Sequence, residues 1–151
     1  VIAKRSDKVA THKGAWTASA MGYVDFVPDL EWMVIQALEK ELREETGVAE
    51  DEIRQSFWDP RGITKYVALG AWSHGQPRPL WLELGFLAET SLTGEEVVER
   101  SRTAKDSWEG KQHAMSAEEV HELVRSQPLG LLHPPGMACI SLGFERLGIA
   151  P

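Results

Sequence analysis

Three glutamates near the middle of the chain have a spacing that could create a cation site. They lie in the segment Lys40-Glu41-Leu42-Arg43-Glu44-Glu45-Thr46-Gly47-Val48. In a helix, Glu41 and Glu45 are four positions apart and Glu41 and Glu44 three, so all three carboxylates would share one face. Carboxylates held this close repel one another unless a positive charge lies among them, and hard oxygen ligands suit Mg²⁺ or Mn²⁺. The segment is therefore a candidate metal site.

The placement of these glutamates favours a function over simple solubility. An acidic run near a helix is most often only a solvated face. Here the glutamates crowd the last turn of the expected helix, where the macrodipole disfavours negative charge by about 0.3–1 kcal/mol each. A helix that used acidic residues only for solubility would carry them in its first turn instead.

A helix from about Leu30 to about Thr46 is expected to position the glutamates. Asp29 can cap its N-terminus, and Gly47 supplies the left-handed residue that commonly ends a helix. Its apolar residues recur at three- and four-residue spacing: Leu30, Met33, Val34, Ala37, Leu38 and Leu42. Packing of this apolar stripe would bring the neighbouring carboxylates to the edge of a cleft.

The same segment resembles the Nudix box. In that family the box reads Gly, five residues, Glu, seven residues, then Arg-Glu-apolar-any-Glu-Glu-any-Gly-apolar. Lys40–Val48 match six of the seven specified positions of its second half. Lys40 stands where the pattern has arginine, and Trp32 where it has the upstream glutamate. The resemblance extends to Trp16–Asp25, which looks like the strand and glycine turn before the box, with Gly22 four residues further upstream than the pattern expects.

This resemblance implies a Nudix-like fold, an α/β/α sandwich around a mixed sheet, formed by residues 1–151 as a single domain that lacks the family's first strand or strands. It also implies Mg²⁺ or Mn²⁺ as cofactor and hydrolysis of a diphosphate linkage in a nucleoside diphosphate derivative. Glu41, Glu44 and Glu45 would be the metal ligands, with Glu41 the most catalytic of them, and Lys40 would steady Glu41. Such chemistry asks little covalent work of the protein, because the metal neutralises the diphosphate oxygens and activates water.

Residues outside the box are weaker candidates for the same site. Glu109 lies in a loop region where many family members supply a further acidic group, and Asp106 is its competitor. Gly22 is expected at the substrate, and Arg5 could reach a substrate phosphate from the preceding strand, although a surface arginine is the commoner case. Cys139, the only cysteine, is interpreted as a packing residue of an apolar helix.

The remaining elements are read from periodicity, turn residues and capping patterns. Strands are expected at Val1–Lys4, Ala15–Met21, Ile63–Trp72 and Leu80–Ala88, and helices at Leu92–Ser101, Ser116–Ser126 and Met137–Leu147. The two central strands are expected to form a long antiparallel hairpin, and the prolines before Met137 to lie in a loop. This order of elements predicts an α/β or α+β sandwich.

Composition limits the classes of partner. The formal net charge is −7 and no basic stripe occurs, which argues against nucleic-acid binding. No run approaches the roughly 18 apolar residues of a membrane helix. With a single cysteine, a disulfide-free cytoplasmic protein is the expectation. The expected partner is a small nucleotide-like molecule, and a homodimer is left open.

Two alternatives compete with hydrolysis. The first is a Nudix-like binding or regulatory module that keeps the fold but has lost turnover. The second is a diphosphate isomerase on the same fold, which would need an acid or thiol near the substrate. The replacement of the arginine by Lys40 and the altered glycine loop favour the binding module, whereas the intact set of Glu41, Glu44 and Glu45 opposes it.

Overall fold

The computed structural model describes residues 1–22, 30–54, 66–74, 81–149 of the chain. Its first sheet has three antiparallel strands in the order β2-β1-β5, namely Trp16–Ala18, Ile2–Arg5 and Gly110–His113. In β1, Ile2 pairs with Ala18 on one side and with His113 on the other. The central strand of this sheet is thus the first one in the sequence. One of its partners is the next strand, β2, and the other is β5, which lies far along the chain.

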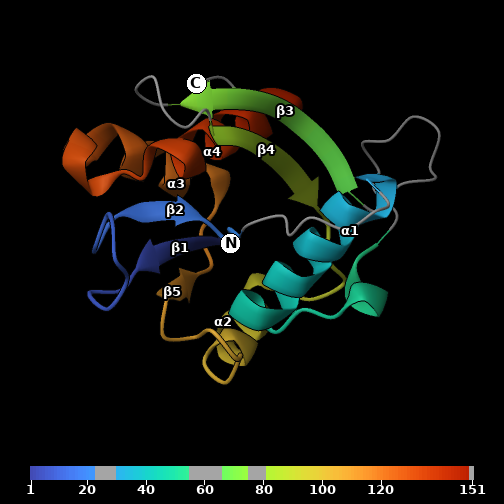
Figure 1. Cartoon of the computed structure of the whole chain (residues 1–151). Helices are drawn as coiled ribbons and strands as arrows, with labels where there is room; N and C mark the ends of the chain where they lie inside the picture. The colour runs from blue at the N-terminus through green and yellow to red at the C-terminus, as the bar shows by residue number, and fades with distance from the viewer. Residues whose placement is uncertain (23–29, 55–65, 75–80, 150–151) are drawn as a thin grey trace.

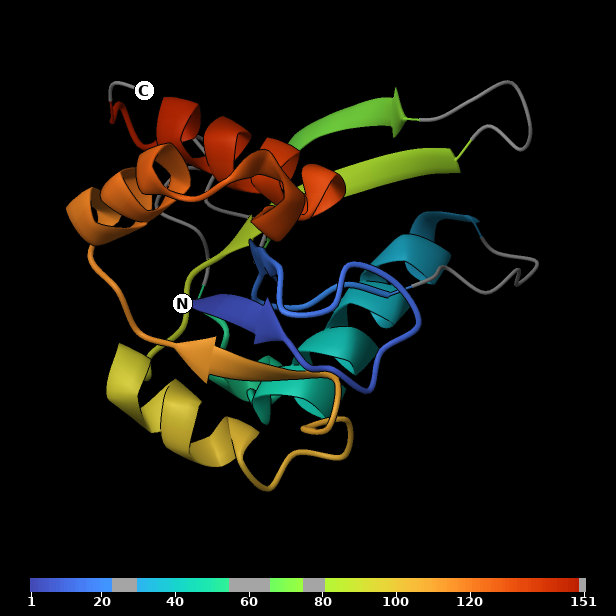
Figure 2. The same ribbon diagram turned by 90° about the vertical axis from the view of Figure 1, so that its left-hand side faces the viewer.

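A second, two-stranded sheet is the antiparallel hairpin of β3 (Tyr66–His74) and β4 (Trp81–Ala88). The register shifts once, between Ala68 and Gly70, as at a β-bulge. In Figures 1 and 2 the hairpin lies apart from the three-stranded sheet, next to α4 (Pro134–Arg146). The described strands therefore form two antiparallel sheets.

The helices lie on both sides of the three-stranded sheet (Figures 1 and 2). On one side, α3 (Ala117–Ser126) and α4 pack over it, and on the other α2 (Gly94–Ser101) lies against β5. The helix α1 (Leu30–Glu41) continues directly into a π-helical turn, Leu42–Thr46. Short 3₁₀ turns at Glu50–Glu52 and Leu129–Leu131 complete the regular structure.

Two hydrophobic clusters hold these elements together. The first joins the three-stranded sheet to α3 and α4 through the buried residues Ile2, Trp16, Val120 and Leu132. The second joins α1, the π turn, α2 and β4 through Val48, Ile53 and Val97, with Leu38, Leu42 and Phe86 packed against them. The two clusters lie on the walls of one cavity.

Most of the elements expected from the sequence are confirmed. Helix α1 begins at Leu30, and its continuation ends before Gly47, whose φ is +72°. The capping boxes expected at the starts of α2 and α3 are present, from Thr93 to Glu96 and from Ser116 to Glu119. The hairpin is also confirmed, although the expected strand start at Ile63 lies outside the described residues.

Two predicted boundaries are corrected, and one strand was missed. Helix α4 begins at Pro134 and not at Met137, because prolines fit the first turn of a helix, where no amide donor is needed. The strand predicted over Ala15–Met21 is shorter, and β5 was not predicted at all. Its sequence, Gly-Lys-Gln-His, has no apolar alternation, so only pairing with β1 makes it a strand.

The architecture is α+β, a class that the sequence predicted. A single mixed sheet is not formed by the strands that the structure describes. None of the helices within the described ranges combines the length and the apolar composition that a membrane span would require.

Gly47 offers a test of how the end of the glutamate segment is held. A Cβ at Gly47 would lie 3.1 Å from Cβ of Arg100, whereas one at Gly14, whose φ is +69°, would meet nothing within 4 Å. Both alanine substitutions should cost about 1–2 kcal/mol through left-handed backbone strain. Gly47→Ala should cost measurably more in urea unfolding, because α2 must also move. Equal losses would contradict a tight contact between the π turn and α2.

Candidate functional site

The π turn at Leu42–Thr46 sets the directions of the glutamate side chains. The Thr46 hydroxyl donates a hydrogen bond to the Leu42 carbonyl at 2.5 Å, and the Gly47 amide donates to the Arg43 carbonyl. Threonine hydroxyls that bind the carbonyl four residues earlier distort helices, and π turns occur frequently at functional sites. Glu44 and Glu45 therefore lie on a π turn and not on the regular α-helical turn that the sequence predicted.

Glu41 lies against the glycine turn. Its side chain is 17% exposed, and a Cβ added to Gly22 would lie 2.0 Å from Cδ of Glu41. A side chain at position 22 would require Glu41 to move, so Gly22 lies directly beside Glu41 despite its displaced position in the sequence. The residues that follow in that loop, 23–29, lie outside the described part of the chain.

Lys40 also contacts Glu41, as the sequence predicted. Its Nζ lies 3.7 Å from Oε1 of Glu41, and its side chain is 46% exposed. Burial raises the pKa of Glu41, and Lys40 opposes this effect. The neighbouring acids Glu44, Glu109 and Asp106 raise the pKa of Glu41 further.

Glu45 is the most deeply held of the three glutamates. Its Oε1 accepts a hydrogen bond of 2.9 Å from the Met21 amide, which ties the π turn to the residues after β2. Burial raises the pKa of Glu45 to about 8, although the Met21 hydrogen bond and Arg5 act in the opposite direction. The nearby carboxyls of Glu109 and Glu41 contribute to the increase. At neutral pH without a cation, Glu45 is therefore mostly protonated.

Glu44 has a different role. Its Oε1 is 2.6 Å from Nζ of Lys105, and this hydrogen-bonded pair lowers the pKa of Glu44. The backbone amide of Asp106 also donates to the Glu44 carbonyl at 2.8 Å. These contacts fasten the loop after α2 to the π turn. Nothing in the sequence pattern had singled out Lys105.

Glu109 enters the site from that same loop, immediately before β5. The Ser6 amide donates to the Glu109 carbonyl at 2.7 Å, which places Glu109 beside the end of β1. Burial and Asp106 raise the pKa of Glu109, and Arg5 lowers it. Arg5 thus faces the carboxyls electrostatically, while its Nε donates to the Thr11 carbonyl. Asp106, the competitor, accepts a hydrogen bond from the Trp108 indole.

The structure therefore brings Glu41, Glu45 and Glu109 within electrostatic range, and Glu44, which also acts on Glu41, pairs directly with Lys105. Within the residues that the structure describes, no group of three His, Cys, Asp or Glu side chains is arranged to hold a metal ion. The donor chemistry nevertheless fits Mg²⁺ or Mn²⁺, because neighbouring carboxyls whose pKa values are raised attract a hard cation. Metal binding would require these carboxyls to move closer together.

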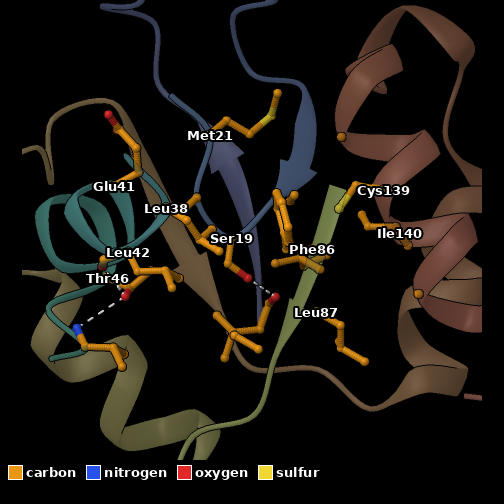
Figure 3. Close-up of a pocket in the computed structure, with 18 of the residues that line it drawn as sticks. Ser19, Met21, Leu38, Glu41, Leu42, Thr46, Phe86, Leu87, Cys139 and Ile140 are labelled. Carbon is orange, nitrogen blue, oxygen red and sulfur yellow. Dashed lines mark hydrogen bonds between the residues drawn. The ribbon is translucent and has the colours of Figure 1, made fainter. Parts of the chain in front are cut away.

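Beside these carboxyls lies a cavity of about 660 Å³. Glu41 and Gly22 border it, and its walls continue over α1, β4 and α4. Figure 3 shows Glu41 at one side and Cys139 with Ile140 at the other, with Leu38, Leu42 and Phe86 around the space. The prediction that Cys139 is a packing residue is thus incomplete, because its thiol also borders the cavity. Burial raises its pKa, so the thiol stays protonated.

Comparisons with protein-family models and with curated proteins identify no relative of this chain. No protein-family model matches the chain, and no curated protein matches it significantly.

The raised pKa of Glu45 predicts a particular pH dependence of stability. In the unfolded chain Glu45 ionises near its ordinary value of 4.5, whereas in the fold it keeps its proton to about pH 8. Its contribution to stability is complete below the lower value and is lost as pH rises through the higher one. In metal-free buffer, the free energy of unfolding should fall between about pH 5 and pH 8.5 by a few kcal/mol, since each pKa unit corresponds to about 1.4 kcal/mol.

Chemical denaturation across this pH range checks the expectation. Glu45→Gln should flatten the profile, because glutamine keeps the shape and has no proton to lose. Glu122→Gln, at an exposed position of α3, is the matched control and should leave the slope unchanged. A wild-type profile that is flat between these pH values would exclude a buried, protonated Glu45.

Proposed function

We propose that the chain is a Nudix-type hydrolase that cleaves a diphosphate linkage with the help of Mg²⁺ or Mn²⁺. One observation carries the proposal. Glu109, which lies more than sixty residues after Glu41 and Glu45, raises the pKa of both of these carboxyls next to a glycine turn and a cavity. Acidic residues that serve only solubility point into water and separate.

Each residue of the site has a role in this proposal. Glu41 and Glu45 hold the cation, and Glu109 is the additional acid. Glu41 also orients the attacking water, since it borders the cavity where a substrate would lie. Lys40 steadies Glu41, and Arg5 faces the diphosphate together with the backbone at Gly22. The cation would supply charge neutralisation on the diphosphate oxygens and a more acidic bound water.

Glu44 supports the site indirectly. Its pairing with Lys105 and its backbone contact with Asp106 hold the loop that delivers Glu109. It becomes a ligand only if the cation displaces Lys105. The expectation that Glu44 is a ligand therefore stays a prediction, and Glu109 takes on more weight than the sequence gave it.

The binding or regulatory module is the second candidate. It is favoured by one observation, namely that the described carboxyls are not gathered into a ready metal cage. A protein without turnover would need only affinity for a phosphorylated ligand. The isomerase alternative also persists, because the protonated Cys139 thiol borders the same cavity as Glu41.

The variant Glu41→Gln distinguishes the hypothesis of an enzyme from that of a binding module. The fold should be retained, because glutamine keeps the side-chain shape beside Gly22. Turnover in Mn²⁺ should fall by about 10²–10⁴, as expected when a positioned base or metal ligand is lost. Steady-state kinetics on a panel of diphosphate compounds measure the effect, with Glu39→Gln as a control for charge on the same helix. If wild type binds a compound tightly with Mn²⁺ yet forms no product, hydrolysis is wrong and the binding module is right.

Lys40 gives a prediction that distinguishes orientation from binding. Because its Nζ contacts Glu41 at 3.7 Å, Lys40→Ala should lower kcat more than it changes KM. Lys40→Arg should keep or raise activity, since the guanidinium retains the charge and can contact a carboxylate through two nitrogens at once. Unchanged kcat and KM in Lys40→Ala would show that Lys40 does not position Glu41.

A further inference from the structure

Among the residues that the structure describes, the walls of the cavity offer few available hydrogen-bonding side chains. Four hydroxyls border it, and each is already engaged: Ser19 donates to the Val1 carbonyl, Thr46 to Leu42, Thr90 to Glu52, and Ser116 accepts from the Glu119 amide. Thr46 and Thr90 also accept bonds from the amides of Val48 and Leu92, so they both donate and accept. Among the wall residues that the structure describes, Glu41 is the one ionised or ionisable carboxyl.

Most of the other wall residues that the structure describes are aliphatic, the exceptions being two methionines, two phenylalanines, Cys139 and the amino-terminal Val1. Val34, Leu38 and Leu42 come from α1 and its π turn, while Ile140 and Gly143 come from α4. Phe86 and Phe144 are the aromatic side chains among the wall residues described. A nucleobase carries several donors and acceptors that would each need a partner in such a space, because an unpaired buried polar group is costly.

The cavity has the size of a ligand site. Its volume of about 660 Å³ lies within the range of roughly 300–1,000 Å³ that is typical of small-molecule pockets. One end meets Glu41 and Gly22, which belong to the proposed diphosphate site, and the far wall reaches Cys139 on α4 (Figure 3). A molecule that fits has a charged head at the carboxyl end and an apolar body beyond it.

We infer that the cavity binds the hydrocarbon chain of an aliphatic diphosphate ester, whose diphosphate lies at Glu41 and the glycine turn. This inference rests on the proposed function and narrows it, since it replaces the nucleoside of the expected substrate by an aliphatic chain. In the reaction, a water oxygen attacks one phosphorus of the diphosphate and the bridging P–O bond breaks. The products are the alkyl phosphate and inorganic phosphate, or their equivalents, and the proton lost by water is released.

Binding without turnover provides the first test. Calorimetry with decyl methylenediphosphonate, which cannot be hydrolysed at its P–C–P bridge, is compared with adenosine methylenediphosphonate in Mn²⁺. The decyl compound should bind at least about tenfold more tightly, because its chain leaves water. Equal affinities, or tighter binding of the adenosine compound, would overturn the inference while leaving diphosphate hydrolysis possible.

A chain-length series on the wild-type protein makes the test quantitative. From butyl to decyl, affinity should rise by about fourfold for each added methylene until the cavity is full. A flat series would mean that the cavity is only a void of the fold and binds no chain. The corresponding alcohols in EDTA test the cavity without the carboxyl site. If the affinity for the alcohols rises with chain length but no diphosphate is hydrolysed, the cavity binds aliphatic chains and the proposed hydrolysis is wrong.

A cavity-filling substitution locates the chain. Cys139→Phe adds bulk to the far wall and should weaken the decyl compound about tenfold or more, with little effect on methylenediphosphonate alone. Leu129→Phe is the matched control, since Leu129 is 87% exposed and outside the cavity. In the wild type, the decyl compound should also protect Cys139, the only thiol, from N-ethylmaleimide. The hydrocarbon chain binds elsewhere if both variants weaken binding of the decyl compound equally. The same conclusion follows if Cys139 reacts with N-ethylmaleimide in the free protein and the decyl compound does not protect it.

Discussion

The site depends on the hydrogen bond that holds the Glu45 carboxyl between the π turn and the residues after β2. This hydrogen bond from the Met21 amide joins two segments that are 24 residues apart. The adjoining residue, Gly22, is thereby held against Glu41, so one contact orders both glutamates. Burying a carboxylate without a cation is costly, and the fold meets this cost by keeping the proton on Glu45. A divalent cation would replace that proton and remove the repulsion among the acids.

The second anchor is the ion pair between Glu44 and Lys105. Lys105 is more than half exposed, so the pair contributes little to global stability. Its importance is geometric, because the same loop continues through Asp106 to Glu109 and then into β5. The carboxyl from the far segment is thus positioned by a strand that pairs with β1 and by a contact to the glutamate segment itself.

How far the sequence predicted this arrangement follows from the range of each interaction. The start of α1, the left-handed Gly47 and the capping boxes at Thr93 and Ser116 depend on neighbouring residues, and they were predicted. The π turn was not, although the Thr46 hydroxyl within it binds the Leu42 carbonyl, a contact that distorts a regular helix. Strand β5, the Lys105 contact and the cavity depend on residues distant in sequence, which periodicity cannot reveal.

The cavity and the acidic site share their structural origin. The residues that follow β2 supply Met21 and Gly22 to the carboxyls, and together with Ala18 and Ser19 they also form one wall of the apolar space. Helix α1 contributes in the same double way, since Glu41 lies at the cavity edge and Leu38 lines its interior. Helical spacing places Leu38 and Glu41 three residues apart on neighbouring positions of one face. Helix α1 thus changes from acidic to aliphatic residues along its surface. A substrate with a diphosphate head, bound through a divalent cation, and an apolar chain would match this change.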